Sequence, residues 1–420
     1  MMAENENGIR RENVDAVIVG GGPAGLAAAV KLYRLGIRNI LVIEREGQLG
    51  GILRQCIHDG FGLTRFKTAL SGPEYARRFI DEAEELGIPY ITDATVLEIS
   101  EDRLVTAASR EGIRQWQAKA VILTMGCRER TRGAAGIPGE RPAGVFTAGA
   151  AQAYMNLYNT MPAREAVILG SGDIGMIMAR RLTLEGAHVK AVCEIQPYPS
   201  GLPRNIEQCL NDYDIPLLLS HGVSAVHGRD RLTGVTVSEV DEHFMPVPGT
   251  EKEYSCDTLI LSVGLIPENE LSIDSGVRLD ERTRGALVDE HYQTTTAGIF
   301  AAGNVLHVHD LVDFVSMEAE GLAEAVAGFI RGGVLEPAVL NIRTGSSIGY
   351  TVPQRISGKK SFDLSLRVKR PLGECRIVVR QDGKEVASRK MKKAIPAEMI
   401  RLSVSSRNFL SCSDLEVSVE

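Results

Sequence analysis

The sequence predicts an α/β protein with two three-layer βαβ domains and a small C-terminal domain that is mainly β. Three observations support this fold class. An apolar strand, a glycine-rich turn and a helix follow one another near the N-terminus, and the same unit recurs around residue 170. After about residue 341 the segments become strand-like and basic. At 420 residues, the chain is long enough for two to three domains.

The first unit, residues 14–44, reads as a strand, a turn, a helix and a second strand. Gly20, Gly22 and Gly25 fit G-x-G-x-x-G, a spacing that allows a tight turn, close approach of a pyrophosphate and close helix packing. Free amides at the helix N-terminus favour an anion, and Glu44 ends the next strand where it can accept hydrogen bonds from ribose hydroxyls. We interpret the unit as a Rossmann-like dinucleotide site. The alternative is a tight turn in another kind of parallel α/β protein.

Composition excludes several classes of protein. The net charge of −7 gives no indication of nucleic-acid binding. The seven cysteines are scattered and include no C-x-x-C, which argues against a disulfide scaffold, a zinc site, an iron–sulfur cluster and a thioredoxin-type redox pair. No apolar run has membrane-spanning length, and the polar N-terminus has no signal-peptide core, so a cytoplasmic enzyme is expected.

Two side chains after the first unit are candidates for chemistry. Cys56 and His58 stand two residues apart and could act as a thiolate and a proton donor beside a bound ring. The alternative is a packed cysteine beside a partly exposed histidine, and this alternative is favoured. Further on, the strand 120–123 ends at Thr124 and Gly126, where a glycine allows the chain to pass close to a ligand.

The second unit, residues 166–194, repeats each element of the first unit in the same order. Gly170, Gly172 and Gly175 form its G-x-G-x-x-G. Two such units in one chain are far more specific than one, so the protein is expected to hold two dinucleotides.

The acid that ends the second unit bears on the choice of nucleotide. Glu194 can pair with a free ribose 2′-hydroxyl but would repel a 2′-phosphate, which favours NADH. Arg204 could still neutralise a phosphate, and Glu194 could instead be a solvated acid without a ligand. Gly264 ends a later strand, as Gly126 does, and is expected to lie against the second nucleotide.

The chain then returns through a strand at residues 298–302 into Gly303 and Asn304, followed by a helix over residues 311–330. The positive end of this helix would point at whatever lies before it, and a flavin pyrimidine ring with developing negative charge is a good candidate. His307, His309, Asp310 and Asp313 lie in the connecting turn. A metal site is one interpretation, but we predict none: the histidines are expected to line the flavin edge, packing or capping roles are equally credible, and Asp310 suits an N-cap.

The C-terminal part, residues 341–420, has 16 Lys+Arg and 8 Asp+Glu, a charge of +8, against −15 for the rest of the chain. Residues 381–384 (QDGK) are typical of a hairpin turn. The charge asymmetry suggests docking on an acidic surface, either the flavoprotein body or a partner subunit. A solvated positive face is the alternative, and a nucleic-acid role is weak because aromatic residues are sparse there.

The order of segments resembles the flavoprotein family with two dinucleotide-binding domains that includes thioredoxin and glutathione reductases. Residues 298–304 match that family's G-[IVF]-F-A-x-G-D segment, except that Asn304 replaces the aspartate. The strings GGILRQCIHDGFGL, GCRERTRG and GNVLHVHDLVDFVSMEAE resemble more closely the FAD/NAD(P) oxidoreductase subunit encoded beside glycerol-3-phosphate dehydrogenase-like proteins and a small cysteine-containing protein. More distantly, the chain is similar to α subunits of opine, hydroxyproline and cyanide-forming dehydrogenases.

The resemblance implies an FAD-dependent NAD(P)H oxidoreductase with a discontinuous FAD domain. The expected domains are 1–140 (FAD, first part), 141–275 (NAD(P)), 276–337 (FAD, return segment) and 338–420 (C-terminal β domain). The residues expected to bind FAD are Gly20, Gly22, Pro23, Ala24, Gly25, Glu44, Arg45, Gly51, Val96, Thr124, Gly126, Gly303, Asn304 and Asp310. Those expected to bind NAD(P) are Gly170, Gly172, Asp173, Ile174, Gly175, Glu194 and Gly264.

Three functions remain open at this point. The first is an electron-transfer subunit that exchanges hydride between NAD(P)H and FAD, while a partner dehydrogenase subunit oxidises glycerol-3-phosphate or a related hydroxy or amino acid. The small cysteine-containing protein is a second expected partner, and homo-oligomer formation is left open. The second function is a stand-alone NAD(P)H oxidase or disulfide reductase. The third is a flavin-bound assembly protein without activity.

Overall fold

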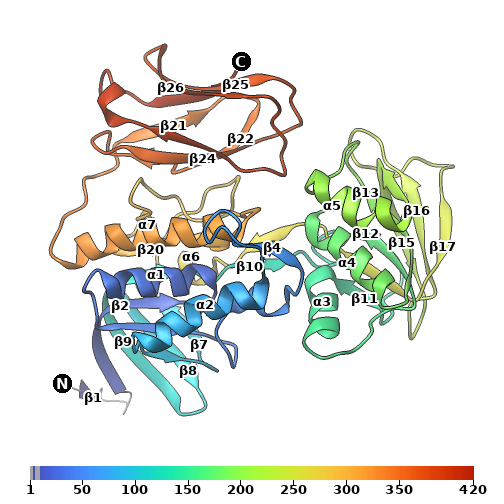
Figure 1. Ribbon diagram of the computed structural model, residues 1–420, viewed down its shortest axis with the longest axis horizontal. Helices are drawn as coiled ribbons and strands as arrows, with labels where there is room; N and C mark the ends of the chain where they lie inside the picture. Colours follow the sequence, from blue (N-terminus) through green and yellow to red (C-terminus); the bar gives the residue numbers. More distant parts are fainter. Residues whose placement is uncertain (1–2, 5–9) are drawn as a thin grey trace. The chain divides into compact units, whose positions relative to one another are not determined.

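The computed structural model describes residues 3–4 and 10–420 and divides into two compact units. Unit 1 contains residues 1–127 and 267–420, and unit 2 contains residues 128–266 (Figure 1). The chain therefore builds the first part of unit 1, then all of unit 2, and finally returns to unit 1. The predicted fold class, α/β with parallel sheets and a β-rich C-terminal region, is confirmed.

The main sheet of unit 1 has the strand order β6-β3-β2-β9-β8-β7, with β1 beside β2 and β20 beside β9. The pairs of β2 with β3, β2 with β9 and β9 with β20 are parallel, and β7, β8 and β9 form an antiparallel meander. Outside the C-terminal part, the strands of unit 1 are β1 Ala3–Glu4, β2 Arg10–Val19, β3 Ile40–Ile43, β4 Asp59–Phe61, β5 Leu70–Ser71, β6 Tyr90–Ile91, β7 Thr95–Ile99, β8 Leu104–Ser109, β9 Gly112–Leu123 and β20 Ile299–Ala301, of which β4 and β5 form a small sheet of their own. The helices are α1 Pro23–Arg34, η1 Gly51–Gln55, α2 Gly72–Glu85, α6 Glu270–Asp274, η3 Gly303–Val305 and α7 Val312–Ile330.

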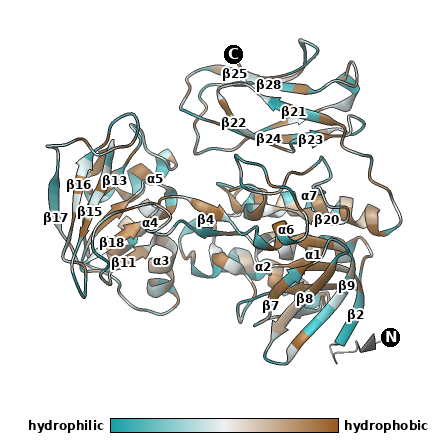
Figure 2. Ribbon diagram, turned by 180° about the vertical axis from the view of Figure 1, so that it is seen from behind, coloured by the Kyte–Doolittle hydropathy of each residue, from teal (hydrophilic) through white to brown (hydrophobic). Residues whose placement is uncertain are grey.

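Both faces of this sheet are covered, which explains the unbroken apolar run in β2. Ala16 and Ile18 join the core beneath α1, α2 and α7, whereas Val17 and Val19 point to the opposite core. Figure 2 shows the hydrophobic colouring along β7 and β8, which line that second core. Ser71 caps α2 in a reciprocal capping box with Glu74, which fixes where this helix begins.

Unit 2 repeats the parallel plan with the strand order β11-β18-β12-β13-β14. One core lies between this sheet and its helices, and a second core lies between the sheet and the antiparallel strands β15, β16 and β17. The strands are β11 Val145–Thr147, β12 Glu165–Leu169, β13 His188–Glu194, β14 Leu217–Leu219, β15 His221–His227, β16 Gly234–Glu239, β17 Lys252–Ser255 and β18 Thr258–Leu261. The helices are α3 Ala148–Asn156, α4 Asp173–Leu184, α5 Pro203–Cys209 and η2 Asn211–Tyr213, and the short strands β10 Cys127–Glu129 and β19 Leu265–Pro267 lie where the chain passes between the units.

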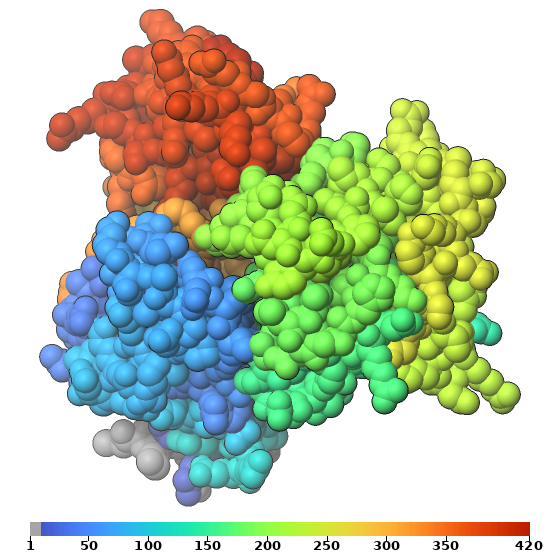
Figure 3. All heavy atoms as spheres, turned by 45° about the vertical axis from the view of Figure 1, so that its right-hand side comes forward, coloured from blue at the N-terminus to red at the C-terminus, as the bar shows by residue number. Residues whose placement is uncertain are grey.

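The C-terminal part of unit 1, coloured orange to red in Figure 3, folds into two sheets around a core of its own. The sheets have the orders β23-β21-β28-β25-β26 and β22-β24-β27. The predicted hairpin is confirmed, because β25 and β26 pair up to Gln381 and Lys384, and Asp382 and Gly383 both have positive φ. The elements are β21 Leu340–Thr344, β22 Ile348–Val352, β23 Arg355–Ile356, β24 Phe362–Val368, β25 Cys375–Gln381, β26 Lys384–Met391, β27 Ile400–Val404, η4 Ser406–Asn408 and β28 Leu415–Val419.

Among the described residues, the structure has no helix that is both long and apolar enough to cross a membrane.

Candidate functional site

The first glycine turn, residues 20–25, joins β2 to α1 as the sequence predicts. Gly20 has a φ of 106°, and a Cβ there would lie 2.5 Å from the backbone oxygen of Thr124. A Cβ on Gly25 would lie only 1.9 Å from the backbone oxygen of Gly20. No side chain caps α1 at Gly22. The turn thus needs glycine at its ends and presents backbone N–H groups rather than side chains at the start of the helix.

Glu44, at the end of β3, is bound to this turn. It is 6% exposed, and its carboxylate accepts hydrogen bonds from the backbone N–H groups of Gly21 (2.7 Å) and Glu46 (2.8 Å). Each carboxylate oxygen keeps a second lone pair for a further donor, such as a ribose hydroxyl. The neighbouring Arg45 is mostly exposed.

Further glycines approach the first glycine turn from the segment after β3. The amide of Gly50 donates to the carbonyl of Gly21 (2.9 Å), and a Cβ on Gly51 would lie 3.0 Å from Cα of Gly22. Gly126 has a φ of 73° and nothing within 4 Å of the place where its Cβ would be. The chain is therefore packed backbone on backbone at Gly51 and open on the Cβ side of Gly126, where a ligand at the carboxyl end of the sheet could approach it.

Two other predicted residues have defined places at the same edge of the sheet. Thr124 donates from Oγ1 to the carbonyl of Val19 (2.8 Å), so it holds the end of β2. Val96 packs in the apolar core, and the amide of Ala94 just before it donates to the carbonyl of Glu44 (3.0 Å).

The return segment brings Gly303 and Asn304 to the first glycine turn. A Cβ on Gly303 would lie 3.0 Å from Cβ of Ala24 in the first turn of α1. The amide of Gly303 donates to Glu318 Oε1 (2.8 Å), and Asn304 Oδ1 accepts from the amide of His309 (3.0 Å). The segment is therefore held from both sides by hydrogen bonds within unit 1.

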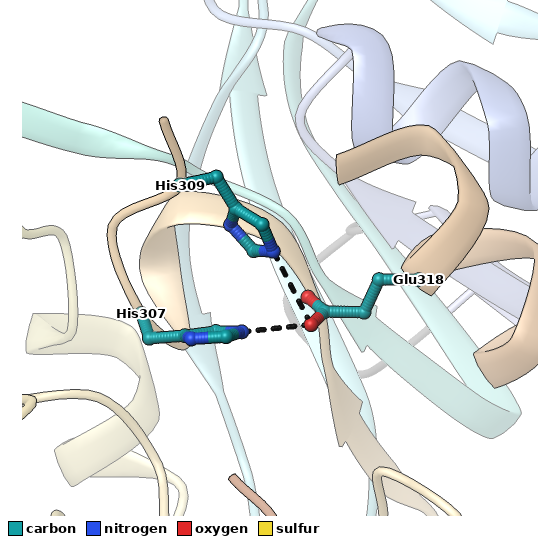
Figure 4. Close-up of side chains that lie close together, drawn as sticks. All are labelled: His307, His309 and Glu318. Carbon is teal, nitrogen blue, oxygen red and sulfur yellow. Dashed lines mark hydrogen bonds and ion pairs between the residues drawn. The ribbon is translucent and has the colours of Figure 1, made fainter. Parts of the chain in front are cut away.

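His307, His309 and Glu318 form a buried cluster behind this segment (Figure 4). Nε2 of His307 lies 2.7 Å from Glu318 Oε2, and Nε2 of His309 lies 3.3 Å from the same oxygen. Burial raises the pKa of Glu318, but the adjacent histidines outweigh it and bring the pKa well below its ordinary value. Burial lowers the pKa of His307, so Glu318 is the charged member of that pair. Since an ionised carboxylate only accepts, we assign the Nε2 protons to the imidazoles.

The same three residues offer ligand atoms within 4.8 Å of one another, as a metal ion would require. However, Nδ1 of both histidines is buried without a hydrogen-bond partner. A metal-bound histidine ordinarily donates its other ring N–H to an acceptor, whereas a neutral histidine protonated at Nε2 leaves only a bare lone pair at Nδ1. The hydrogen-bonded triad therefore accounts for the geometry better than a metal site does.

The two aspartates of this turn have roles that the sequence did not indicate. Asp310 is not an N-cap: α7 begins at Val312, its N-cap is Leu311, and Asp310 pairs with Arg367 of the C-terminal part (3.3 Å). Asp313, 3% exposed, accepts from three backbone amides within residues 62–65. The N-cap prediction is wrong because Asp310 stands one residue before the N-cap position, and its carboxylate is bound by Arg367 and by the amide of Met399.

Cys56 and His58 lie in the loop after η1. The Cys56 thiol donates to the carbonyl of Ile52 (3.4 Å), and burial raises its pKa to about 12. A thiolate at Cys56 is therefore not favoured at neutral pH, contrary to the role considered from the sequence. The ring of His58 stacks at a tilt on Phe61, with centroids 5.0 Å apart.

The second glycine turn, residues 170–175, repeats the geometry of the first one between β12 and α4. Gly170 has a φ of 101°, and a Cβ there would lie 2.0 Å from the backbone oxygen of Ser262. A Cβ on Gly175 would lie 2.6 Å from the backbone oxygen of Gly170. The helix again has no side-chain cap, here at Gly172.

Glu194 ends β13 as Glu44 ends β3. It is 4% exposed and accepts from the amides of Ser171 (3.1 Å) and Gln196 (3.0 Å). Its Oε2 accepts in addition from the hydroxyls of Ser171 (2.7 Å) and Ser200 (2.5 Å). A solvated strand-end acid, the alternative considered from the sequence, is inconsistent with this burial.

The remaining predicted residues of unit 2 surround the second glycine turn. Asp173 Oδ1 accepts from the amide of Leu202 (2.7 Å) and from Asn205 Nδ2 (2.7 Å), so the loop after β13 is bound to the start of α4. Ile174 packs against the helix-side core. Gly264 has a φ of 103° and, like Gly126, nothing within 4 Å of its Cβ direction.

Sequence reasoning missed Glu318, Arg367 and Ser200. For Glu318 a signal existed: it shares a helix face with Leu322 and Val326, four and eight residues on, and an acid on a buried apolar face requires partners. For Arg367 and Ser200 the partners are distant in sequence or lie in a loop, and no local pattern marks them.

The sequence from residue 14 to residue 326 matches the family described as pyridine nucleotide-disulphide oxidoreductase, and the chain belongs to this family. Among curated relatives, the HcnB component of hydrogen cyanide synthase from Pseudomonas protegens is 27% identical over 79% of this chain and 74% of its own length. An opine oxidase subunit from Agrobacterium tumefaciens is 28% identical over 69% of this chain and 61% of its own length.

Solved structures share the fold at low identity. Thioredoxin reductase of T. acidophilum has a TM-score of 0.63 at 24% identity and covers 76% of this chain and 98% of its own. A NAD-dependent persulfide reductase of A. fulgidus has a TM-score of 0.59 at 18% identity and covers 93% of this chain and 74% of its own. These likenesses show a thioredoxin-reductase-like fold.

Proteins of this family bind FAD and NAD(P), and the residues of both turns fit such groups. Each turn has an uncapped helix start for a pyrophosphate, an acid with at least one lone pair left for a ribose, and a positive-φ glycine with nothing within 4 Å of its Cβ direction nearby. All the residues predicted to bind FAD lie in unit 1, and all those predicted to bind NAD(P) lie in unit 2.

Proposed function

We propose that this flavin enzyme binds FAD at the first glycine turn and NADH at the second, and serves as the electron-transfer subunit of a larger dehydrogenase. The observation that carries the proposal is the repetition of one hydrogen-bond frame, a strand-end glutamate bound to two backbone amides, in both units.

In this proposal, the chain's residues bind and orient, and the cofactors carry the chemistry. When bound, the two cofactors supply hydride transfer between nicotinamide and flavin. The first turn of α1 receives the FAD pyrophosphate, and Glu44 accepts from the adenosine ribose. Glu318 holds the amide of Gly303 and thereby the turn that carries Asn304. Because this acid is buried and takes several donors, the turn is fixed before the cofactor arrives.

NADH is favoured over NADPH because Glu194 is buried and charged groups of like sign repel at short range. A 2′-phosphate beside this carboxylate would be repelled and would lose solvation. Arg204 is the cation that the sequence suggested could neutralise this phosphate.

The subunit role rests on the relatives and on charge. HcnB and the opine oxidase relative are both named as subunits of larger enzymes. The C-terminal part, at +8, offers a basic surface for an acidic partner. We propose that this partner oxidises glycerol-3-phosphate or a related hydroxy or amino acid, and that a small cysteine-containing subunit completes the assembly.

The alternative of a disulfide reductase has less support. None of the seven cysteines forms a disulfide, and burial raises the pKa of both Cys56 and Cys193 to about 12. A redox dithiol needs two adjacent thiols, one of them readily ionised.

Oxygen consumption tests the subunit role against a stand-alone oxidase. With NADH in air, we expect the isolated, FAD-loaded chain to turn over slowly, and an artificial electron acceptor to raise turnover at least tenfold. Fast turnover with oxygen alone would favour the stand-alone oxidase and contradict the subunit role.

A further inference from the structure

Arg367, on β24 of the C-terminal part, is a cation whose five hydrogen bonds join two parts of unit 1. Its side chain is 15% exposed. Within the C-terminal part it donates to the hydroxyl of Tyr350 (3.1 Å) and to the carbonyls of Pro396 (2.8 Å) and Ala397 (2.6 Å). Toward the return segment it donates to the carbonyl of Val308 (3.0 Å) and to Asp310 Oδ1 (3.3 Å).

The contact with Val308 leads directly to the predicted flavin turn. The carbonyl of Val308 and the amide of His309 belong to one planar peptide unit. Arg367 donates to the oxygen of this peptide (3.0 Å), and the N–H of the same peptide, that of His309, donates to Asn304 Oδ1 (3.0 Å). The orientation of the peptide therefore fixes both hydrogen bonds at once, and a charged donor on the oxygen also strengthens the N–H as a donor.

Other contacts hold the same loop against the C-terminal part. The amide of Met399 donates to Asp310 Oδ2 (3.4 Å), and the ring of Tyr350 meets His307 edge-on at 6.0 Å. The guanidinium of Arg401 lies over the ring of Phe314 in α7, 4.7 Å from its centroid. Of the C-terminal residues in these contacts, Arg367 is the one that is hydrogen-bonded to the 308–309 peptide, which in turn donates to Asn304.

We propose that Arg367 is a positioning residue for the flavin site: it orients the 308–309 peptide, and this peptide orients the Asn304 carboxamide toward bound FAD. The C-terminal β part is then required for the flavin site in addition to any docking role. This inference rests on the proposed binding of FAD beside Gly303 and Asn304.

The test compares Arg367→Lys and Arg367→Met with Arg370→Met, an exposed arginine three residues along the same chain. The readouts are the Kd of the apoprotein for FAD, from quenching of flavin fluorescence, and the visible circular dichroism of the bound flavin. We expect Arg367→Met to raise the Kd about tenfold, since hydrogen bonds from a charged group are lost, and to change the dichroism. The Kd of Arg367→Lys should lie between those of the wild type and Arg367→Met. Arg370→Met should match the wild type in Kd and dichroism.

A double-mutant cycle with Asn304→Ala separates positioning from general destabilisation. If Arg367 acts through Asn304, replacing Arg367 in the Asn304→Ala background should change the Kd by less than about twofold. Additive effects of the two substitutions would overturn the inference. The Arg367→Lys variant keeps the cycle usable if Arg367→Met fails to fold.

The outcomes distinguish this inference from the proposed function. A wild-type chain that does not bind FAD would contradict the proposed function. A wild-type chain that binds FAD, with Arg367→Met indistinguishable from it in Kd and dichroism, would overturn the role of Arg367 alone.

Discussion

The first and second glycine turns share one hydrogen-bond arrangement and differ in the segments that pack against it. In both, a strand-end glutamate accepts from the second residue of the turn and from the residue two positions after itself. Around the first turn, the approaching segment is glycine, with Gly50 and Gly51 packed on the backbone. Around the second turn one glycine also approaches, since a Cβ on Gly201 would lie 2.9 Å from the backbone oxygen of Ser171, but side-chain hydrogen bonds hold the loop. Ser200 binds Glu194, and Asp173 binds the loop at Leu202.

This difference indicates two kinds of site. Glycine-on-glycine packing allows a close, permanent backbone fit, as a tightly held cofactor requires. Closure by side chains of a loop can open at the cost of a few hydrogen bonds, which suits a nucleotide that enters and leaves in each cycle.

Replacing the last glycine of each turn should affect the two sites separately. A Cβ on Gly25 would lie 1.9 Å from the Gly20 oxygen, so Gly25→Ala should cost about 3 kcal/mol of stability and remove FAD. Gly175→Ala, with its nearest atom at 2.6 Å, should weaken NADH binding and leave the FAD content unchanged. Flavin absorbance per chain measures the FAD content, and thermal unfolding with and without NADH measures stability and NADH binding.

Gly328→Ala in α7 is the matched control, because nothing lies within 4 Å of its Cβ direction. It should leave FAD binding unchanged and raise stability by up to about 1 kcal/mol. Equal FAD loss in Gly25→Ala and Gly175→Ala would contradict the assignment of one cofactor to each turn.

Removing the acid of the first turn should weaken FAD binding. Glu44→Ala leaves the buried amide of Gly21 and the partly buried amide of Glu46 without their acceptor, which costs about 1–3 kcal/mol, and we expect at least a tenfold higher Kd for FAD. The control is Glu46→Ala, whose side chain is 61% exposed and whose amide is retained. An unchanged FAD Kd in Glu44→Ala would remove this acid from the site.

The acid of the second turn should set the nucleotide preference instead. Glu194→Ala removes the charge that opposes a 2′-phosphate, so the ratio of kcat/KM for NADPH to that for NADH should rise about tenfold. Glu185→Ala, an exposed acid at the end of α4, should leave this ratio unchanged. If Glu194→Ala also leaves it unchanged, the preference does not arise from Glu194.

One thiol in each unit has a pKa raised by burial, and neither should react in the folded protein. Burial raises the pKa of Cys56 and Cys193 from 9.0 to about 12, so both are protonated at pH 8, whereas Cys412 is exposed. Since the folded pKa lies above the unfolded one, the thiols favour folding below pH 9 and lose this effect as the pH rises toward 12. Mass spectrometry after brief iodoacetamide treatment at pH 8 should find Cys412 modified and the other two intact. Rapid modification of Cys56 would restore it as a thiolate candidate.

The sequence predicted what depends on local pattern. Glycine spacing and strand-end acids located both turns, and the Asp-Gly pair at residues 382–383 located a hairpin, because each follows from backbone conformation within a few residues.

Features that depend on distant contacts were not predicted. Asp310 fits an N-cap locally, yet Arg367, 57 residues away in sequence, takes its carboxylate. Asp313 and Glu318 likewise bind groups that only the folded chain brings near, and burial rather than spacing decides the state of the Cys56 thiol. The role proposed for Arg367 is therefore accessible only from the structure.

Hydride exchange between the two nucleotide sites is tested most directly by anaerobic reduction of the FAD-loaded chain with NADH and with NADPH, followed through the flavin absorbance at about 450 nm. The two-turn account predicts that the absorbance bleaches with both nucleotides and faster with NADH. A chain that holds FAD and stays oxidised with both nucleotides would contradict hydride exchange and favour a flavin-bound assembly protein.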